Sequence, residues 1–293
     1  FCCEKLLAGL VGRGLHSGAQ VGGTTAVAQW RRDRLAVEPN QRLLNSMMVP
    51  ITGQEVTWSA LEQALAVAEK EKSQIYGLFA LEKEGQKESL ITKALETEFV
   101  NRCEEAGIAG QFIPEVGSME QLIYRRARWV DLIVLSPFSA SVTSEPEILA
   151  GYRQLIKRPP GPILVVPKTW SPMNKMLLAY DDSPMAQGAL FAAAYVSKQW
   201  GIPLMVLGIA SIQMVKTAVL NKARDYLESQ QVSAEYIGGM SSKTAAIVNA
   251  VEQTGSNLVV LGGDEQPAML DIVTSSPIID LIQSADVPLL VCG

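Results

Sequence analysis

The run Asn257-Leu-Val-Val-Leu-Gly262 decides the fold, because a near copy of it, Asp131-Leu-Ile-Val-Leu-Ser136, stands 126 residues earlier in the chain. The same offset of 126 relates Pro288-Leu-Leu-Val-Cys-Gly293 to Pro162-Ile-Leu-Val-Val-Pro167. Internal similarity at a fixed offset is the mark of a repeated structural unit. The back halves of two such units are therefore visible in the sequence.

The fronts of the two units match as well. Met176-Leu-Leu-Ala-Tyr-Asp181 corresponds to Met47-Met-Val-Pro-Ile-Thr52 at an offset of 129. Three matches in the same order at nearly constant spacing indicate two copies of one domain. We assign residues 46–167 to repeat 1 and residues 173–293 to repeat 2, joined by the linker Pro-Lys-Thr-Trp-Ser-Pro at 167–172.

Each repeat alternates short apolar runs with longer segments of helical pattern. Apolar runs of five or six residues without polar alternation are typical of strands that helices cover on both faces. Because right-handed crossovers return the chain to the same sheet, we predict an α/β fold of two tandem Rossmann-like three-layer domains, each with a parallel five-stranded sheet. Strands are expected near 46–51, 74–80, 111–115, 131–136, 162–166, 175–180, 203–209, 233–238, 257–262 and 288–292. Helices are expected near 56–71, 88–106, 118–128, 146–157, 184–199, 212–230, 243–254 and 275–284.

Residues 1–45 do not fit the repeat. We expect a helical arm or the tail of an upstream domain, with the arginines at 31, 32 and 34 as solvated surface rather than a phosphate site. The sequence does not begin with methionine, which favours a piece of a longer polypeptide.

Composition excludes several classes of protein. The chain has 293 residues, 48% of them hydrophobic and 19% charged, which is typical of a globular protein and not of a disordered chain or a coiled coil. A net charge of −5 without a basic stripe argues against nucleic acid as a partner. One histidine, His16, and four cysteines without C-x-x-C spacing predict neither a zinc site nor a disulfide framework, so we expect a reducing, cytoplasmic setting. No apolar run reaches the 18 or so residues of a membrane helix.

Three local motifs carry a family resemblance. They are the strand and turn Leu178-Ala-Tyr-Asp-Asp-Ser-Pro184, the helix start Gly117-Ser-Met-Glu-Gln-Leu-Ile123 with its counterpart at 241–247, and a loop that runs from Gly262-Gly-Asp-Glu to Ser275-Ser276. Together with the order of strands and helices over residues 45–293, they resemble the universal stress protein (UspA-like) family in its tandem two-domain form.

The resemblance implies an adenine nucleotide alpha-hydrolase-like fold and, by likeness to the ATP-binding members, a site for ATP or another adenine nucleotide in repeat 2. There the opening aspartate lies beside adenine or ribose, and the glycine-rich loop surrounds the phosphates. Glycines let backbone N–H groups approach phosphate, and a following helix adds its own N–H groups and dipole. The residues carried over are Asp181, Gly262, Gly263, Ser275 and Ser276.

Both repeats depart from the family pattern. In repeat 2, Asp182 and Glu265 stand where the family has glycine, and carboxylates beside phosphate predict weak binding. In repeat 1, Thr52 replaces the aspartate, and the loop from Ser136 to Thr143 contains proline and phenylalanine but no glycine. We expect repeat 1 to be empty.

A catalytic role has little support in the sequence. A nucleophile needs a nearby base, and His16 lies outside both repeats. Asp181 with Asp264 or Glu265 would make a carboxylate pair, but Asp182 and Ser183 also fit the start of a helix at Pro184.

The first hypothesis is a non-enzymatic stress-response and regulatory module with at most one weak nucleotide pocket. The alternative is a degenerate, nucleotide-free cytoplasmic regulatory domain of a larger protein such as a membrane transporter. The third is an ATP-hydrolysing or adenylate-transferring enzyme, which only the analogy of fold supports.

The last strand of each repeat is apolar throughout. An exposed flat apolar edge invites aggregation unless another strand pairs with it. We therefore expect residues 162–166 and 288–292 to pair within the chain as a pseudo-dimer, as universal stress proteins pair between subunits. A homodimer, or contact with an upstream domain or a membrane protein, is the other expected association.

Overall fold

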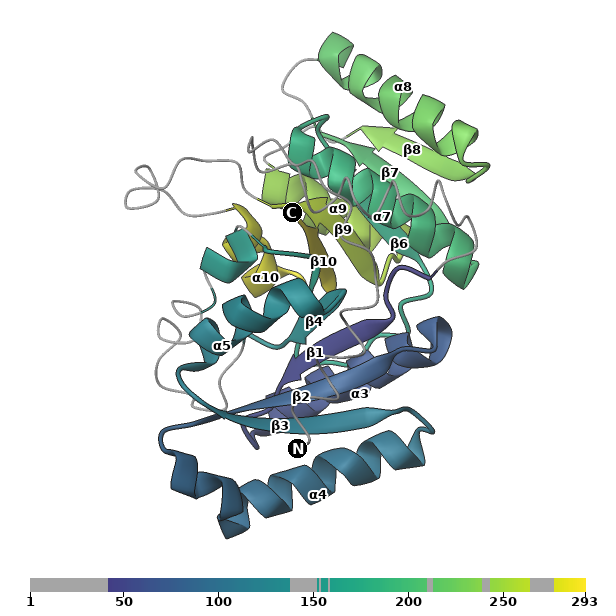
Figure 1. The fold of residues 1–293 in the computed structure, drawn as a ribbon. Helices are drawn as coiled ribbons and strands as arrows, with labels where there is room; N and C mark the ends of the chain where they lie inside the picture. The colour runs from purple at the N-terminus through teal and green to yellow at the C-terminus, as the bar shows by residue number, and fades with distance from the viewer. Residues whose placement is uncertain are drawn as a thin grey trace, which may run out of the picture.

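Ten strands of the described chain form one sheet in the order β3-β2-β1-β4-β5-β10-β9-β6-β7-β8 (Figure 1). The computed structural model describes residues 42–137, 152, 154–157, 159–209, 213–238, 243–263 and 277–293. Within each half the strand order is the same, because β3-β2-β1-β4-β5 corresponds to β8-β7-β6-β9-β10 read from the outer edge inward. The predicted α/β class with five parallel strands in each repeat is confirmed.

The bounds of the elements follow the repeat. The strands of the first half are β1 Ser46–Pro50, β2 Gln74–Leu81, β3 Gly110–Val116, β4 Leu132–Leu135 and β5 Ile163–Val165. Its helices are α3 Glu55–Glu71, α4 Leu90–Glu105 and α5 Met119–Arg126, with short 3₁₀ turns η1 Glu84–Glu88 and η2 Ala127–Trp129. The strands of the second half are β6 Met176–Tyr180, β7 Leu204–Gly208, β8 Ala234–Gly238, β9 Leu258–Gly262 and β10 Leu289–Cys292. Its helices are α7 Pro184–Trp200, α8 Gln213–Ser229, α9 Lys243–Thr254 and α10 Pro277–Ser284.

These bounds agree with the predicted ones within about three residues for the elements that the structure describes. The helix expected near 146–157 lies largely outside the described residues, as does all of the arm before residue 42. No helix in the described ranges is long and apolar enough to span a membrane.

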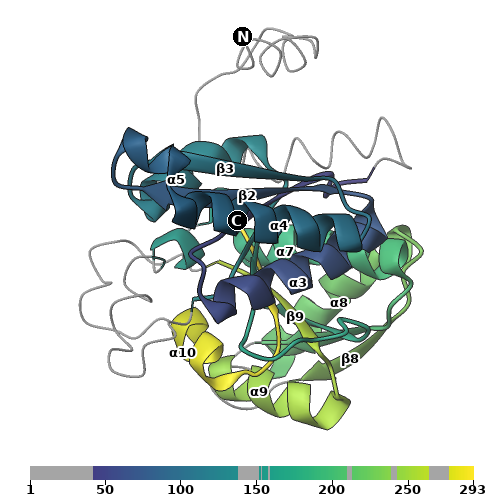
Figure 2. The ribbon, with the colours of Figure 1, turned by 90° about the horizontal axis from the view of Figure 1, so that it is seen from below.

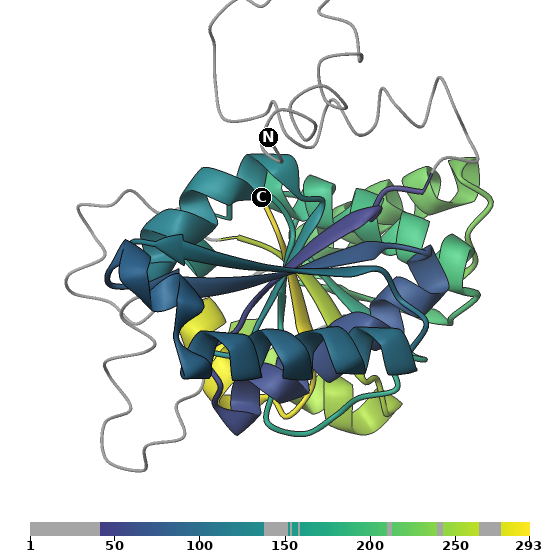
Figure 3. The same cartoon turned by 60° about the horizontal axis from the view of Figure 1, so that its bottom comes forward.

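Helices cover both faces of the twisted sheet (Figure 3). Alternate residues of a strand point to opposite faces, so Met47 and Val49 of β1 join the core under α3, α4, α7 and α8, while Met48 joins the core under α5, α9 and α10. At the outer edges, α4 lies along β3 and α8 along β8 (Figures 1 and 2). The interior strands are buried on both faces, which explains their unbroken apolar runs.

The two halves meet at β5 and β10. These strands are antiparallel, with Leu164 opposite Leu290, whereas all other strand pairs in the described sheet are parallel. The last strands of the repeats thus lie side by side. Because β5 and β10 pair with each other, neither apolar edge is exposed, and the two halves form one continuous sheet.

The segment just before β1 is part of the core, although the sequence assigned it to the arm. Leu43 and Leu44 are 4% and 6% exposed, and the Leu43 N–H donates to the Tyr195 hydroxyl of α7 at 2.9 Å. The linker plays the matching part in repeat 1. Gln63 of α3 is fully buried, and its side-chain amide bonds both backbone polar groups of Ser171, at 2.9 and 3.0 Å. Each segment that enters a repeat therefore packs on the first helix of the other repeat.

Candidate functional site

The carboxyl ends of β6 and β9 form the candidate site. The chain leaves β6 toward β7 on one side and later returns to β9 on the other, so the strand order reverses between β6 and β9. In open α/β sheets, ligands bind in the crevice at such a switch point. Asp181 directly follows β6, and Gly262 ends the neighbouring strand β9. The structure therefore brings these two predicted residues to one edge of the sheet.

Asp181 is held as a carboxylate by two neighbours. Its Oδ1 accepts from the Ser183 hydroxyl at 2.6 Å and from the Ser183 N–H at 3.2 Å, while Lys243 Nζ lies 3.1 Å from Oδ2. Burial alone would raise the pKa of Asp181, but the hydrogen bonds from Ser183 and the charge of Lys243 outweigh it, and the pKa lies below its ordinary value. Asp181 is an acceptor and not a proton donor.

Asp182 adopts a left-handed backbone conformation, with φ of 66°. The family pattern has glycine at this position, and glycine adopts such angles without strain. The Asp182 side chain accepts from the Tyr180 hydroxyl at 3.1 Å and pairs with Lys222 of α8. Both carboxylates of the turn are thus matched by a lysine.

Ser183 serves the helix start that the sequence also indicated. Its hydroxyl accepts from the Ala186 N–H at 3.2 Å as the N-cap of α7, and Pro184 is the first helical residue. The helix-start interpretation of this turn is correct for Ser183, whereas Asp182 faces Lys222 and Tyr180.

Lys222 and Lys243 are the site residues that sequence reasoning missed. Each lysine neutralises one aspartate of the turn, so neither carboxylate stands there without a cation beside it. One signal could have found Lys243. A helix that follows a parallel strand starts at the carboxyl edge of the sheet, and Lys243 is the first residue of α9.

Gly262 and Gly263 are required for close packing. A Cβ on Gly262 would lie 2.5 Å from the Met185 carbonyl carbon and 2.6 Å from the Ala186 nitrogen, in the first turn of α7. Gly263 donates its N–H to the Cys292 carbonyl at 2.8 Å, so in this structure that N–H group is engaged by β10. The rest of the predicted phosphate loop, with Ser275, Ser276, Asp264 and Glu265, lies outside the described residues.

Repeat 1 has different chemistry at the matching place. Thr52 takes the position of Asp181, and the first helix, α3, begins at Glu55, where the N-cap residue Gln54 makes no side-chain cap hydrogen bond. Ser136, which corresponds to Gly262, is 7% exposed, and its hydroxyl has no hydrogen-bond partner among the described residues. With Thr52 after β1, repeat 1 therefore lacks the carboxylate that Asp181 supplies in repeat 2.

Two features of the described residues outside this turn concern nucleophiles and metal binding. Burial raises the pKa of the Cys103 thiol to about 11, which keeps it protonated near neutral pH. No group of three or more metal-binding side chains gathers in the described ranges. His16 lies outside the described residues.

Several known proteins resemble this chain in structure or in sequence. A universal stress protein of Archaeoglobus fulgidus superposes with a TM-score of 0.68 at 20% identity, over 85% of this chain and 96% of that chain. A putative universal stress protein of Pseudomonas aeruginosa superposes with a TM-score of 0.62 at 14% identity, over 86% and 94%. In sequence, the universal stress protein Slr1230 of Synechocystis is 23% identical over 194 residues, which cover 65% of this chain and 68% of that protein. No family model matches the chain.

This is the tandem universal stress protein fold. Because the two solved structures are matched over nearly their whole lengths, the likeness covers both repeats and their junction. The resemblance drawn from the three motifs is confirmed. At the turn after β6, this chain pairs Asp181 with Lys243 and Asp182 with Lys222.

Proposed function

We propose that this protein is a non-enzymatic regulatory module of universal stress type whose repeat 2 binds an adenine nucleotide weakly. The observation that carries the proposal is the ion pair at the switch point, where the Asp181 carboxylate and Lys243 Nζ lie 3.1 Å apart. A carboxylate accepts hydrogen bonds from ribose hydroxyls or the adenine amine, and an ammonium group attracts phosphate.

Weak binding follows from the same contacts. Lys243 is already paired with Asp181 and Lys222 with Asp182, so a phosphate must share or displace an existing partner of each lysine. The Gly263 N–H already donates to the Cys292 carbonyl of β10, so a phosphate would have to compete for it. Both effects subtract from the free energy that a nucleotide would gain on binding.

The absence of an activated group in the described site supports a non-enzymatic role. A general acid near neutral pH needs a raised pKa, whereas that of Asp181 is lowered. Burial also keeps the Cys103 thiol protonated near neutral pH. These features fit a regulatory protein of the cytoplasm, in which Cys103 and Cys292 are buried.

A nucleotide-free interaction domain within a larger protein, such as a membrane transporter, is the second candidate. The glycine geometry favours it, because Gly262 and Gly263 are both explained by packing without any ligand. In that case the turn after β6 and the end of β9 serve only the packing of repeat 2 and bind no nucleotide.

Calorimetric titration of the full chain with ATP, AMP and cyclic AMP distinguishes the nucleotide-binding module from the nucleotide-free interaction domain. We expect weak binding of at least one nucleotide, loss of binding in Asp181→Ala, and no change in the matched repeat 1 variant Thr52→Ala. Equal loss in both variants, or no heat with any nucleotide, would favour the interaction domain. Release of phosphate or pyrophosphate from ATP at a steady rate would instead show an enzyme.

A further inference from the structure

The start of helix α3 in repeat 1 carries backbone donors that no described side chain satisfies. The first four N–H groups of a helix have no acceptor within the helix, and the side chain at the N-cap commonly accepts from one of them. In α3 the N-cap residue Gln54 makes no such bond, and the N–H groups of Glu55 and Val56 have no acceptor among the described residues. The dipole of this 17-residue helix adds positive potential at the same place.

A buried hydroxyl without a partner lies at the end of the neighbouring strand β4. Ser136 directly follows this strand and is 7% exposed, and its hydroxyl has no hydrogen-bond partner in the part of the chain that the structure describes. Buried polar groups are nearly always hydrogen-bonded. The Ser136 hydroxyl therefore points to a bound group that does not belong to the described chain.

The Ser136 side chain points to the face of the sheet that α3 covers. Alternate residues of a strand point to opposite faces, and Leu132 and Val134 of β4 lie in the core under α3. Ser136 continues this alternation, so its hydroxyl lies on the α3 side at the carboxyl edge of the sheet.

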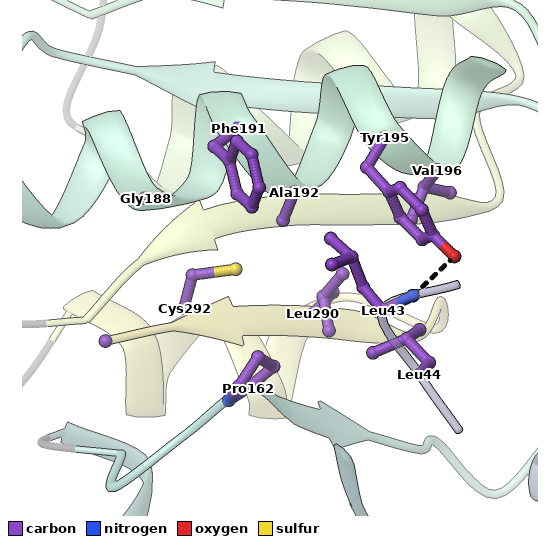
Figure 4. A pocket seen from close by; sticks show the side chains of 11 residues that line it. Leu43, Leu44, Pro162, Gly188, Phe191, Ala192, Tyr195, Val196, Leu290 and Cys292 are labelled. Carbon is purple, nitrogen blue, oxygen red and sulfur yellow. Dashed lines mark hydrogen bonds between the residues drawn. The ribbon is translucent and has the colours of Figure 1, made fainter. Parts of the chain in front are cut away.

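Repeat 2 shows which part of the helix faces this position. A Cβ on Gly262, which corresponds to Ser136, would lie 2.5 Å from the Met185 carbonyl carbon and 2.6 Å from the Ala186 nitrogen, in the first turn of α7. Farther along, α7 lies over β10 (Figure 4). Because α3 and α7 start 129 positions apart and have the same length, the first turn of α3 takes the matching place in repeat 1. The unpartnered hydroxyl and the uncapped helix start therefore face each other.

We propose that repeat 1 binds a small inorganic oxyanion, such as phosphate or sulfate, between Ser136 and the first turn of α3. The N–H groups of Glu55 and Val56 and the Ser136 hydroxyl donate to its oxygens, as helix N-termini do in many anion sites. The Glu55 carboxylate opposes an anion only weakly, because this residue is exposed and solvent screens its charge. An inorganic anion has no base or sugar, so repeat 1 is still expected to take no nucleotide.

Amide NMR spectra of the full chain, titrated with inorganic phosphate and separately with sulfate, test the proposal residue by residue. The Glu55 and Val56 signals should shift together and saturate with either anion. The Thr92 amide at the start of α4 is the internal control and should not shift, because the Ser89 hydroxyl already accepts from it. Shifts of the lysines of repeat 2 without any shift in α3 would overturn the proposal. Shifts in α3 with AMP but with neither inorganic anion would overturn it as well.

Two variants separate the hydroxyl from the helix start. Ser136→Ala should weaken phosphate binding about tenfold, the effect of losing one hydrogen bond to a charged group. Gln54→Ser supplies an N-cap side chain that accepts from the first turn, so it should stabilise the protein and yet weaken phosphate binding.

Ser197→Ala is the matched control, because it removes a buried hydroxyl that donates to the Ile202 carbonyl at the other end of α7. It should leave the affinity for phosphate unchanged. Melting curves establish that each variant is folded. Equal phosphate affinity in Ser136→Ala and the parent chain would overturn the proposal, since the anion would then bind without the buried hydroxyl.

Discussion

Trp200, the last residue of α7, donates its indole N–H to the carboxylate of Glu71, the last residue of α3, at 2.6 Å. The two residues hold equivalent positions in the two repeats, 129 apart. Tyr195 donates a second hydrogen bond to the same carboxylate, also at 2.6 Å, and Glu71 is fully buried. At the junction, the Glu71 carboxyl group of repeat 1 thus accepts two hydrogen bonds from repeat 2.

Glu71→Ala should destabilise the protein by about 2 kcal/mol, because two partly buried donors lose their acceptor. Glu71→Gln should remain within about 1 kcal/mol of the parent chain, since its carbonyl oxygen still accepts from Trp200. Urea unfolding curves of the three proteins give the comparison. Equal losses in the two variants would mean that shape alone, and not hydrogen bonding, matters at this position.

The buried Glu71 should also make stability depend on pH. Burial raises the pKa of Glu71 above its ordinary value near 4.5, and the hydrogen bonds from Tyr195 and Trp200 offset only part of the effect. The folded protein therefore keeps this proton to a higher pH than the unfolded chain. The stabilising contribution is complete below the unfolded pKa and is lost as the pH rises through the folded one.

Unfolding free energies measured between pH 4 and pH 8 check this point. The difference between the parent chain and Glu71→Gln should shrink or change sign as the pH rises from about 4.5, and then level off. Asp181 should change stability with pH in the opposite direction, because its pKa is lowered in the folded protein. Its contribution to the free energy of unfolding is lost only as the pH falls through that lower pKa. A difference that grows with pH would contradict the assignment to Glu71.

Repetition made the fold predictable from the sequence. The offsets of 126 and 129 give two copies of each strand, and the strand bounds follow from unbroken apolar runs such as Leu258–Gly262. The packing of Leu43 and Leu44 on the other repeat was not predictable, because two leucines after a polar run give no periodic signal. Their burial depends on α7, which is far away in the sequence.

The candidate site was predictable only at its strand ends. Asp181 and Gly262 follow apolar runs, and the carboxyl ends of parallel strands share one edge. Lys222 lies within α8, and its pairing with Asp182 depends on how that helix is rotated against the sheet. A sequence pattern does not specify that rotation to within one side chain.

Gly262→Ala should destabilise the protein by about 3 kcal/mol, since the new methyl group would meet backbone atoms of Met185 and Ala186 that cannot rotate away. Gly85→Ala is the matched control, because no heavy atom lies within 4 Å of a Cβ at that position. Its effect should stay within about 0.5 kcal/mol. Thermal and urea unfolding measure both. A tolerated alanine at 262 would show that α7 can move away from β9.

Lys243→Met should raise the pKa of Asp181, because the change removes the cation 3.1 Å from the carboxylate and keeps a side chain of similar length. Carbon-detected NMR titration of the aspartate carboxyl reports the pKa directly. Lys175→Met is the comparison, since Lys175 bonds the Thr254 carbonyl instead. An unchanged pKa of Asp181 would mean that Ser183 alone holds the carboxylate.

The last prediction concerns Asp182, which combines a left-handed backbone with a pair to Lys222. Asp182→Gly should increase ATP affinity about tenfold, because the change removes a carboxylate from the turn after β6 and frees Lys222 to meet phosphate. Glycine accepts a φ of 66° without strain, so the turn should keep its shape. Lys222→Ala, which keeps the carboxylate and removes the cation, should lower the affinity. Titration calorimetry of both variants at two salt concentrations separates the effects, since the gain in Asp182→Gly should shrink at high salt. If Asp182→Gly gains nothing while Lys222→Ala loses nothing, neither side chain faces the ligand. The pair would then serve only to hold α8 against the turn after β6, and the proposed nucleotide site would have to depend on Asp181 and Lys243 alone.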